Sequence, residues 1–178
     1  MRPSSTCAIF SSRDRNRRMN QHNPKLKGDH NPNFRRLPRI LFVSECTGSR
    51  TAMAESYGRK LGEGLIDVLA AGAELTALDP RTIEVMREDG IDVRDYTARV
   101  FSRDLAEWAD IIVVLCATPG KVHPYIPEGA VRKDWPIRNP ARQAKNDTDK
   151  APFVKARDDI KRRIQQLVNA IKLSRLGQ

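Results

Sequence analysis

The sequence has 178 residues, of which 39% are hydrophobic and 6% are aromatic. This length suits one compact domain with or without a tail, and no apolar run approaches the roughly 20 residues that would span a bilayer. Three cysteines (Cys7, Cys46 and Cys116) are too few, and odd in number, for a disulfide scaffold. We therefore expect a protein of the reducing cytoplasm that does not engage a membrane.

The net charge of +10 is concentrated near the N-terminus. Residues 1–40 hold ten Lys or Arg against two Asp, whereas residues 41–178 hold 22 basic and 20 acidic residues. Residues 1–38 also lack an apolar period, which predicts a disordered basic tail followed by a folded domain over 39–178. The tail could contact nucleic acid weakly through phosphates. Alternatives are a solubilising tail, an organelle transit peptide, or translation that begins at Met19.

The folded part alternates between predicted strands and predicted helices. Apolar runs predict strands near 39–43, 66–71, 110–116 and 130–135. Capping signals and helical periodicity predict helices near 50–61, from Asp79-Pro80 to Gly90, after Ser102, and over 151–173. The last helix carries an apolar stripe of Phe153, Ile160, Ile164, Leu167 and Ile171.

This alternation predicts a parallel sheet with helices on both faces, and ligands bind such folds beyond the carboxyl ends of the strands. The first strand is followed by a tight loop and a helix start, which together form a cradle for an anion. Arg50 would grip the anion, or would instead tie the loop through a salt bridge to Glu45. The expected anion-binding residues are Ser44, Glu45, Cys46, Thr47, Gly48, Ser49, Arg50 and Thr51.

The loop resembles that of the low-molecular-weight protein tyrosine phosphatase superfamily, which includes the thioredoxin-coupled arsenate reductases. That family places Cys, five residues, Arg and Ser or Thr after its first strand. Further matches indicate the arsenate reductase branch and extend the resemblance over residues 38–173. They are Pro80–Met86, Gly90-Ile91-Asp92, Val114-Leu115-Cys116, Trp135 and Phe153–Ile160.

The resemblance implies a flavodoxin-like three-layer α/β fold, with a four-stranded parallel sheet and helices on both faces. It also implies phosphatase or arsenate reductase chemistry that needs no cofactor. The spacing of His, Cys, Asp and Glu independently gives no indication of a metal site.

Several positions depart from the family's chemistry. Aligned without gaps, Ser44 stands at the nucleophile position, and an alcohol needs an adjacent general base that is not evident here. Asn139 stands at the general-acid position, where an amide cannot supply a proton. Of the arsenate reductase cysteines, the middle one is kept as Cys116 and the third is replaced by His123, so the disulfide relay cannot operate in that form. Together with the resemblance, these changes predict a catalytically degenerate member, a pseudoenzyme. Its expected partner is a phosphate-like anion or a phosphoprotein.

A second register makes Cys46 the nucleophile. Cys46-Thr47-Gly48 resembles the family's Cys-Thr-Gly if two residues are inserted before it and two are deleted after it. The protein would then be an active phosphatase or arsenate reductase with a shortened loop and fewer N–H groups around the anion. In the alignment without gaps, Glu45 lies inside the cradle, where it repels an anion if its carboxylate points inward and is harmless if it points to solvent.

Overall fold

The structure, a computed structural model, describes residues 36–117 and 124–176. His123 and nearly all of the predicted basic tail lie outside these ranges, so the expectations for them stay predictions. The described elements are β1 (Arg39–Cys46), α2 (Ser49–Leu61), β2 (Asp67–Glu74), α3 (Pro80–Glu88), α4 (Arg103–Trp108), β3 (Ile111–Val114), β4 (Val131–Asp134), α5 (Pro140–Gln143) and α6 (Ala151–Leu176).

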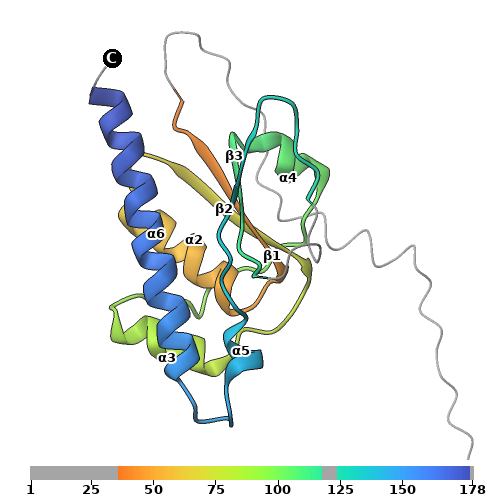
Figure 1. The fold of residues 1–178 in the computed structure, drawn as a ribbon, viewed down its shortest axis with the longest axis vertical. Helices are drawn as coiled ribbons and strands as arrows, with labels where there is room; N and C mark the ends of the chain where they lie inside the picture. Colours follow the sequence, from red (N-terminus) through yellow and green to blue (C-terminus); the bar gives the residue numbers. More distant parts are fainter. Residues whose placement is uncertain (1–35, 118–123, 177–178) are drawn as a thin grey trace, which may run out of the picture. The chain divides into compact units, whose positions relative to one another are not determined.

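The strands form a parallel four-stranded sheet in the order β2-β1-β3-β4. Helices α2, α3 and α6 lie on one face of the sheet, and α4 lies on the other (Figure 1). This arrangement confirms the predicted flavodoxin-like three-layer fold, in which β1 occupies the centre and its carboxyl end points toward α5.

Both faces of β1 are buried. Ile40 and Phe42 belong to a large hydrophobic cluster with residues of α2 and α6, whereas Leu41 and Val43 belong to a smaller cluster with residues of α4. Successive side chains of a strand point to opposite faces, so a central strand between two helical layers is apolar at every position. This is why the start of β1 appears in the sequence as an unbroken apolar run.

β1 continues three residues beyond its predicted end. Cys46 pairs with Glu74 of β2, and the Thr47 N–H donates to the Glu74 carbonyl at 3.0 Å. Gly72 permits this approach, because a Cβ at that position would lie 2.6 Å from the Thr47 nitrogen. The segment from Ser44, which the sequence suggested as a loop, is therefore partly strand.

Helix α5 is an element that the sequence analysis did not predict. The Asn139 side chain caps it by accepting from the Ala141 N–H at 3.1 Å, and Pro140 is its first residue. The same capping pattern occurs at α3, where Asp79 accepts from the Arg81 N–H. An Asn-Pro pair is a known helix-start signal.

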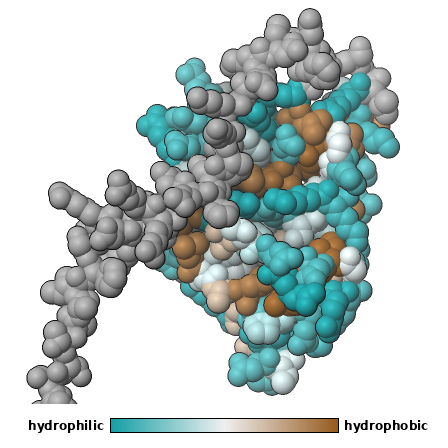
Figure 2. All heavy atoms as spheres, turned by 180° about the vertical axis from the view of Figure 1, so that it is seen from behind, coloured by the Kyte–Doolittle hydropathy of each residue, from teal (hydrophilic) through white to brown (hydrophobic). Residues whose placement is uncertain are grey.

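The described part of the face seen from behind carries both polar and apolar areas (Figure 2). Seen from behind, hydrophilic side chains surround separate apolar areas (Figure 2). The large hydrophobic residues that are exposed come from different parts of the fold, namely Leu75, Val100, Tyr125, Val131 and Leu173. Among the helices that the structure describes, none combines the length and the hydropathy that a membrane span requires.

Candidate anion-binding site

The predicted anion loop lies at the carboxyl end of β1 and leads directly into α2. Gly48 precedes the helix and supplies no side-chain cap, so the N-terminus of α2 keeps N–H groups directed toward the loop. The helix dipole adds partial positive charge there. Thr51 reinforces the turn, because its hydroxyl donates to the Gly48 carbonyl at 3.0 Å.

Arg50 is the buried cation of this loop, with only 4% of its surface exposed. Its Nη1 donates to two backbone carbonyls, those of Leu115 and Ile137, each at 2.9 Å. Its Nη2 is buried and has no hydrogen-bond partner among the described residues. Carbonyls orient a guanidinium but carry no net charge, so this geometry leaves a buried positive charge with one unused donor group.

Ser44 is fully buried on β1. Its Oγ lies 3.9 Å from Cys116 Sγ, which also accepts from the Glu45 N–H at 3.2 Å. Within residues 36–117 and 124–176, neither a histidine nor a carboxylate hydrogen-bonds to the Ser44 hydroxyl. Among the described residues, none is placed to act as the base that would make this serine a nucleophile.

Cys46 is half-buried and lies beside the residue at the predicted acid position. Asn139 Nδ2 is 3.9 Å from Cys46 Sγ, while the Asn139 Oδ1 is occupied by the cap of α5. The structure thus brings Asn139, at the predicted acid position, next to Cys46, although the two residues are 93 positions apart. An amide in this place can donate a hydrogen bond to sulfur but cannot protonate a leaving group.

Glu45 forms an ion pair with α5. The Arg142 Nη2 lies 3.2 Å from Glu45 Oε1, and the Glu45 side chain is 22% exposed. The predicted alternative for Arg50 was a salt bridge to Glu45; the hydrogen bonds of Arg50 go instead to the two carbonyls described above. Arg142 could not be predicted as a partner of Glu45, since nothing in its local sequence sets it apart from other surface arginines.

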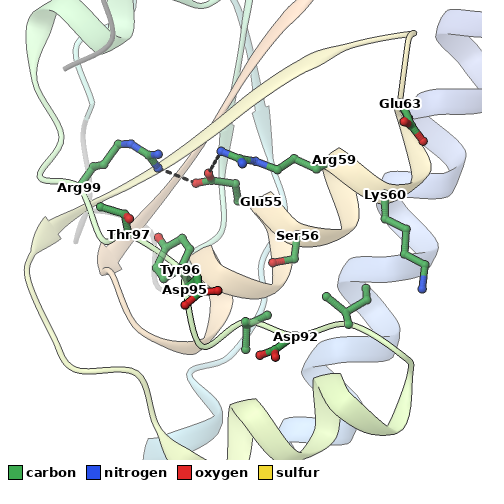
Figure 3. Close-up of a pocket in the computed structure, with 12 residues that line it drawn as sticks. Glu55, Ser56, Arg59, Lys60, Glu63, Asp92, Asp95, Tyr96, Thr97 and Arg99 are labelled. Atoms are coloured by element: carbon green, nitrogen blue, oxygen red, sulfur yellow. Dashed lines mark hydrogen bonds and ion pairs between the residues drawn. The ribbon is translucent and has the colours of Figure 1, made fainter. Parts of the chain in front are cut away.

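A second polar cluster, also missed from the sequence, surrounds Glu55 on α2 (Figure 3). The Glu55 carboxylate accepts from Arg59 at 2.5 Å, from Arg99 at 2.8 Å and from the Ala70 N–H at 2.9 Å. The cluster borders a pocket of about 500 Å³ between α2 and residues 91–99. The spacing of four residues between Glu55 and Arg59 was the available signal, but Arg99 could not be inferred from it. Among the described residues, His, Cys, Asp and Glu side chains form no group able to hold a metal ion.

Comparison with known proteins places this geometry in a family. The model of the low molecular weight phosphotyrosine protein phosphatase family matches residues 39–176. An arsenate reductase of Halalkalibacterium halodurans is 35% identical over 129 residues, which cover 71% of this chain and 91% of that protein. The chain therefore belongs to the low-molecular-weight phosphotyrosine protein phosphatase family, in its arsenate reductase branch.

Solved structures agree with this placement. An arsenate reductase in the phosphate binding state is similar with a TM-score of 0.63 and 27% identity, covering 76% of this chain and 99% of that one. Wzb of Vibrio vulnificus, solved in complex with benzylphosphonate, shares the fold with a TM-score of 0.63 over the same shares of the two chains, at 23% identity. The resemblance inferred from the sequence is confirmed at the level of family and fold.

Proposed function

We propose that this domain binds a phosphate-like anion, either free or on a phosphorylated partner, and that it turns such a group over poorly or not at all. The observation that carries the proposal is Arg50. A buried guanidinium with an unused Nη2, beside the uncapped N-terminus of α2, matches the donors that an oxyanion requires. The solved relative in a phosphate binding state supports the same ligand class.

Poor turnover follows from the groups around the loop. Attack on a phosphoryl group needs a nucleophile, and departure of the leaving oxygen needs a proton. Ser44 is buried against Cys116, and no described residue is placed to act as its base. Asn139 stands at the predicted acid position. Binding does not depend on either group, so a cradle can persist after the chemistry is lost.

The binding test is thermal unfolding in phosphate against chloride at equal ionic strength. At tenfold its dissociation constant, a ligand stabilises the native state by about 1.4 kcal/mol, which corresponds to roughly 3–5 °C for a domain of this size. We expect Arg50→Gln to abolish this shift and Arg103→Gln, on the exposed surface of α4, to keep it. A wild-type protein whose melting temperature does not respond to phosphate would refute the proposal.

The second candidate function is catalysis by Cys46, favoured by the contact between Cys46 Sγ and Asn139. Here the thiolate would attack the phosphorus of a monoester or the arsenic of arsenate while the bond to the departing oxygen breaks. That oxygen would take its proton from water, and Arg50 would stabilise the transferring group. The test is hydrolysis of an aryl phosphate by wild type and Cys46→Ser. Turnover that disappears with Cys46 establishes this alternative, whereas absence of turnover in both proteins leaves the binding proposal in place.

The paired substitution Ser44→Cys with Asn139→Asp tests whether catalysis is lost because Ser44 and Asn139 replace the nucleophile and the general acid. If Ser44 stands at the nucleophile position, this variant regains a thiol and a proton donor and should hydrolyse aryl phosphate faster than wild type. If the variant folds and binds phosphate but hydrolyses aryl phosphate no faster than wild type, the alignment that places Ser44 at the nucleophile position is wrong.

A further inference from the structure

A second pocket borders helix α5. It has a volume of about 630 Å³ and is formed by the segment around α5 and by the amino-terminal half of α6. Ile137 lines this pocket, and its carbonyl also accepts from Arg50 Nη1 at 2.9 Å. Gln143 at the end of α5 lines it too, whereas Asn139 at the start of α5 lies 3.9 Å from Cys46 Sγ. The same short segment therefore borders both this pocket and the anion loop.

The acidic side chains of the pocket are already paired. Asp158 Oδ1 lies 2.8 Å from Arg157 Nε. Asp159 is paired with Arg162 and also with Arg163, the latter at 3.0 Å. Because arginines of the same helix balance these carboxylates, the acids of the lining do not offset its remaining positive charges.

Two basic side chains of the pocket have no such partners. Arg138 and Lys155 are exposed, and within residues 36–117 and 124–176 neither side chain forms an ion pair or a hydrogen bond. They belong to the two segments that meet at the pocket, Arg138 just before α5 and Lys155 on α6. Two cations that line one pocket repel each other, and a bound carboxylate relieves that repulsion. The lining therefore favours an acidic ligand.

The position of the pocket indicates what kind of molecule carries this acid. Inorganic phosphate has a single anionic centre, so it cannot occupy the anion loop and the pocket together. Helix α5, which borders both, has four residues and is only about 6 Å long, whereas an extended peptide spans about 3.3–3.6 Å per residue. A peptide with its phosphate in the loop can thus reach the pocket with a residue a few positions away. Pro152 and Ala156 add apolar surface for the methylene groups of a Glu side chain.

We propose that the pocket between α5 and α6 binds an acidic side chain of a phosphorylated partner through Arg138 and Lys155, while the phosphate of that partner occupies the anion loop. The inference rests on the proposed anion binding and narrows it, because it selects a phosphorylated protein with Glu close to the modified residue. Arg138 and Lys155 determine specificity and do not touch the phosphate.

The test is calorimetric titration of the full chain, at low ionic strength, with two phosphotyrosine peptides. One peptide carries Glu at the positions that flank the phosphotyrosine, and the other carries Gln at the same positions. Wild type should bind the Glu peptide about threefold to tenfold more tightly, which is the contribution of two partly solvated ion pairs. The paired substitution Arg138→Gln with Lys155→Gln should bind both peptides alike and should bind inorganic phosphate as tightly as wild type.

The matched control is Lys172→Gln with Arg175→Gln. These residues lie near the carboxyl end of α6, outside the lining of the pocket, and their substitution lowers the net charge by the same amount. This variant should keep the preference of wild type for the Glu peptide. Unfolding temperatures without ligand, expected to stay close to wild type for such surface changes, confirm that each variant is folded.

The outcomes separate the two proposals. If wild type binds neither peptide nor inorganic phosphate, anion binding itself fails and the inference fails with it. If wild type binds phosphate but does not prefer the Glu peptide, the anion site stands and the role of the pocket is wrong. A preference that survives the loss of Arg138 and Lys155, or that the control loses equally, comes from charge elsewhere in the chain and overturns the assignment. An unphosphorylated Glu peptide that binds as tightly as its phosphorylated form would refute the link between pocket and loop.

Discussion

Among the described residues, Glu55 is the acidic side chain that folding buries. Its carboxylate is fully occupied by Arg99, Arg59 and the Ala70 N–H, as Figure 3 shows for the two arginines. These contacts join α2 to β2 and to the segment that runs along the edge of the sheet. A carboxylate is tolerated in such a place only because every oxygen has donors.

Removing the charge of Glu55 should therefore be costly. We expect Glu55→Gln to lower the free energy of unfolding by about 2–4 kcal/mol, since it leaves the largely enclosed Arg99 without its counterion. Arg59→Gln should cost less than about 1 kcal/mol, because that arginine is 60% exposed. Urea unfolding measures both, and equal losses in the two variants would contradict the enclosed position of the Glu55–Arg99 pair.

The phenol groups of Tyr57 and Tyr96 make the free energy of unfolding depend on pH in the alkaline range. Burial raises the pKa of Tyr96 to about 12, and burial together with a hydrogen bond to Asp89 raises the pKa of Tyr57. An unfolded tyrosine ionises near pH 10, or about 2 units lower than Tyr96. Between about pH 10 and 12 the folded state therefore holds protons that the unfolded state releases, and stability falls as pH rises. Tyr96→Phe should flatten this fall in urea unfolding; an unchanged slope would show that Tyr96 is not its source.

The sequence correctly predicted the elements whose bounds depend on neighbouring residues. The helix-start signals at Asp79-Pro80 and Ser102 predicted α3 and α4, and the apolar stripe predicted α6, which the structure extends to Leu176. The prediction was incomplete where contacts with residues distant in the sequence set the bounds of an element. β1 runs on to Cys46 because Gly72, 26 residues later in the sequence, leaves room for it. The helix-start signal for α5 is present in Asn139-Pro140, although the interpretation of Asn139 from the sequence concerned only the general-acid position.

The apolar stripe of α6 makes a matched pair of substitutions possible. Ile164 is fully buried and Leu173 is 68% exposed on the same helix. We expect Ile164→Ala to lower the free energy of unfolding by about 2–4 kcal/mol through lost burial and a residual cavity. Leu173→Ala should change it by less than about 0.5 kcal/mol. Similar losses from both would mean that α6 packs along a different face.

For the whole molecule, the sequence predicted where the candidate site lies but not how it is held. The alternation of strands and helices located the loop at the carboxyl end of β1, and the loop sequence singled out Arg50. The carbonyls that orient Arg50 come from Leu115 and Ile137, which are 65 and 87 residues away. Backbone partners leave no pattern in a sequence, because every residue type offers the same carbonyl.

The hydrophobic clusters on the two faces of the sheet differ in size, so the helices on the two faces should differ in how readily they open locally. On one face, α4 is six residues long and contributes Leu105 and Ala106 to the smaller cluster, whereas α2 and α6 share the larger one. Less buried surface means a lower free energy of local opening. In hydrogen exchange, the amides of α4 should therefore lose protection before those of α2, so the layer beside Cys116 would open to reagents while the helix that carries Arg50 stays folded.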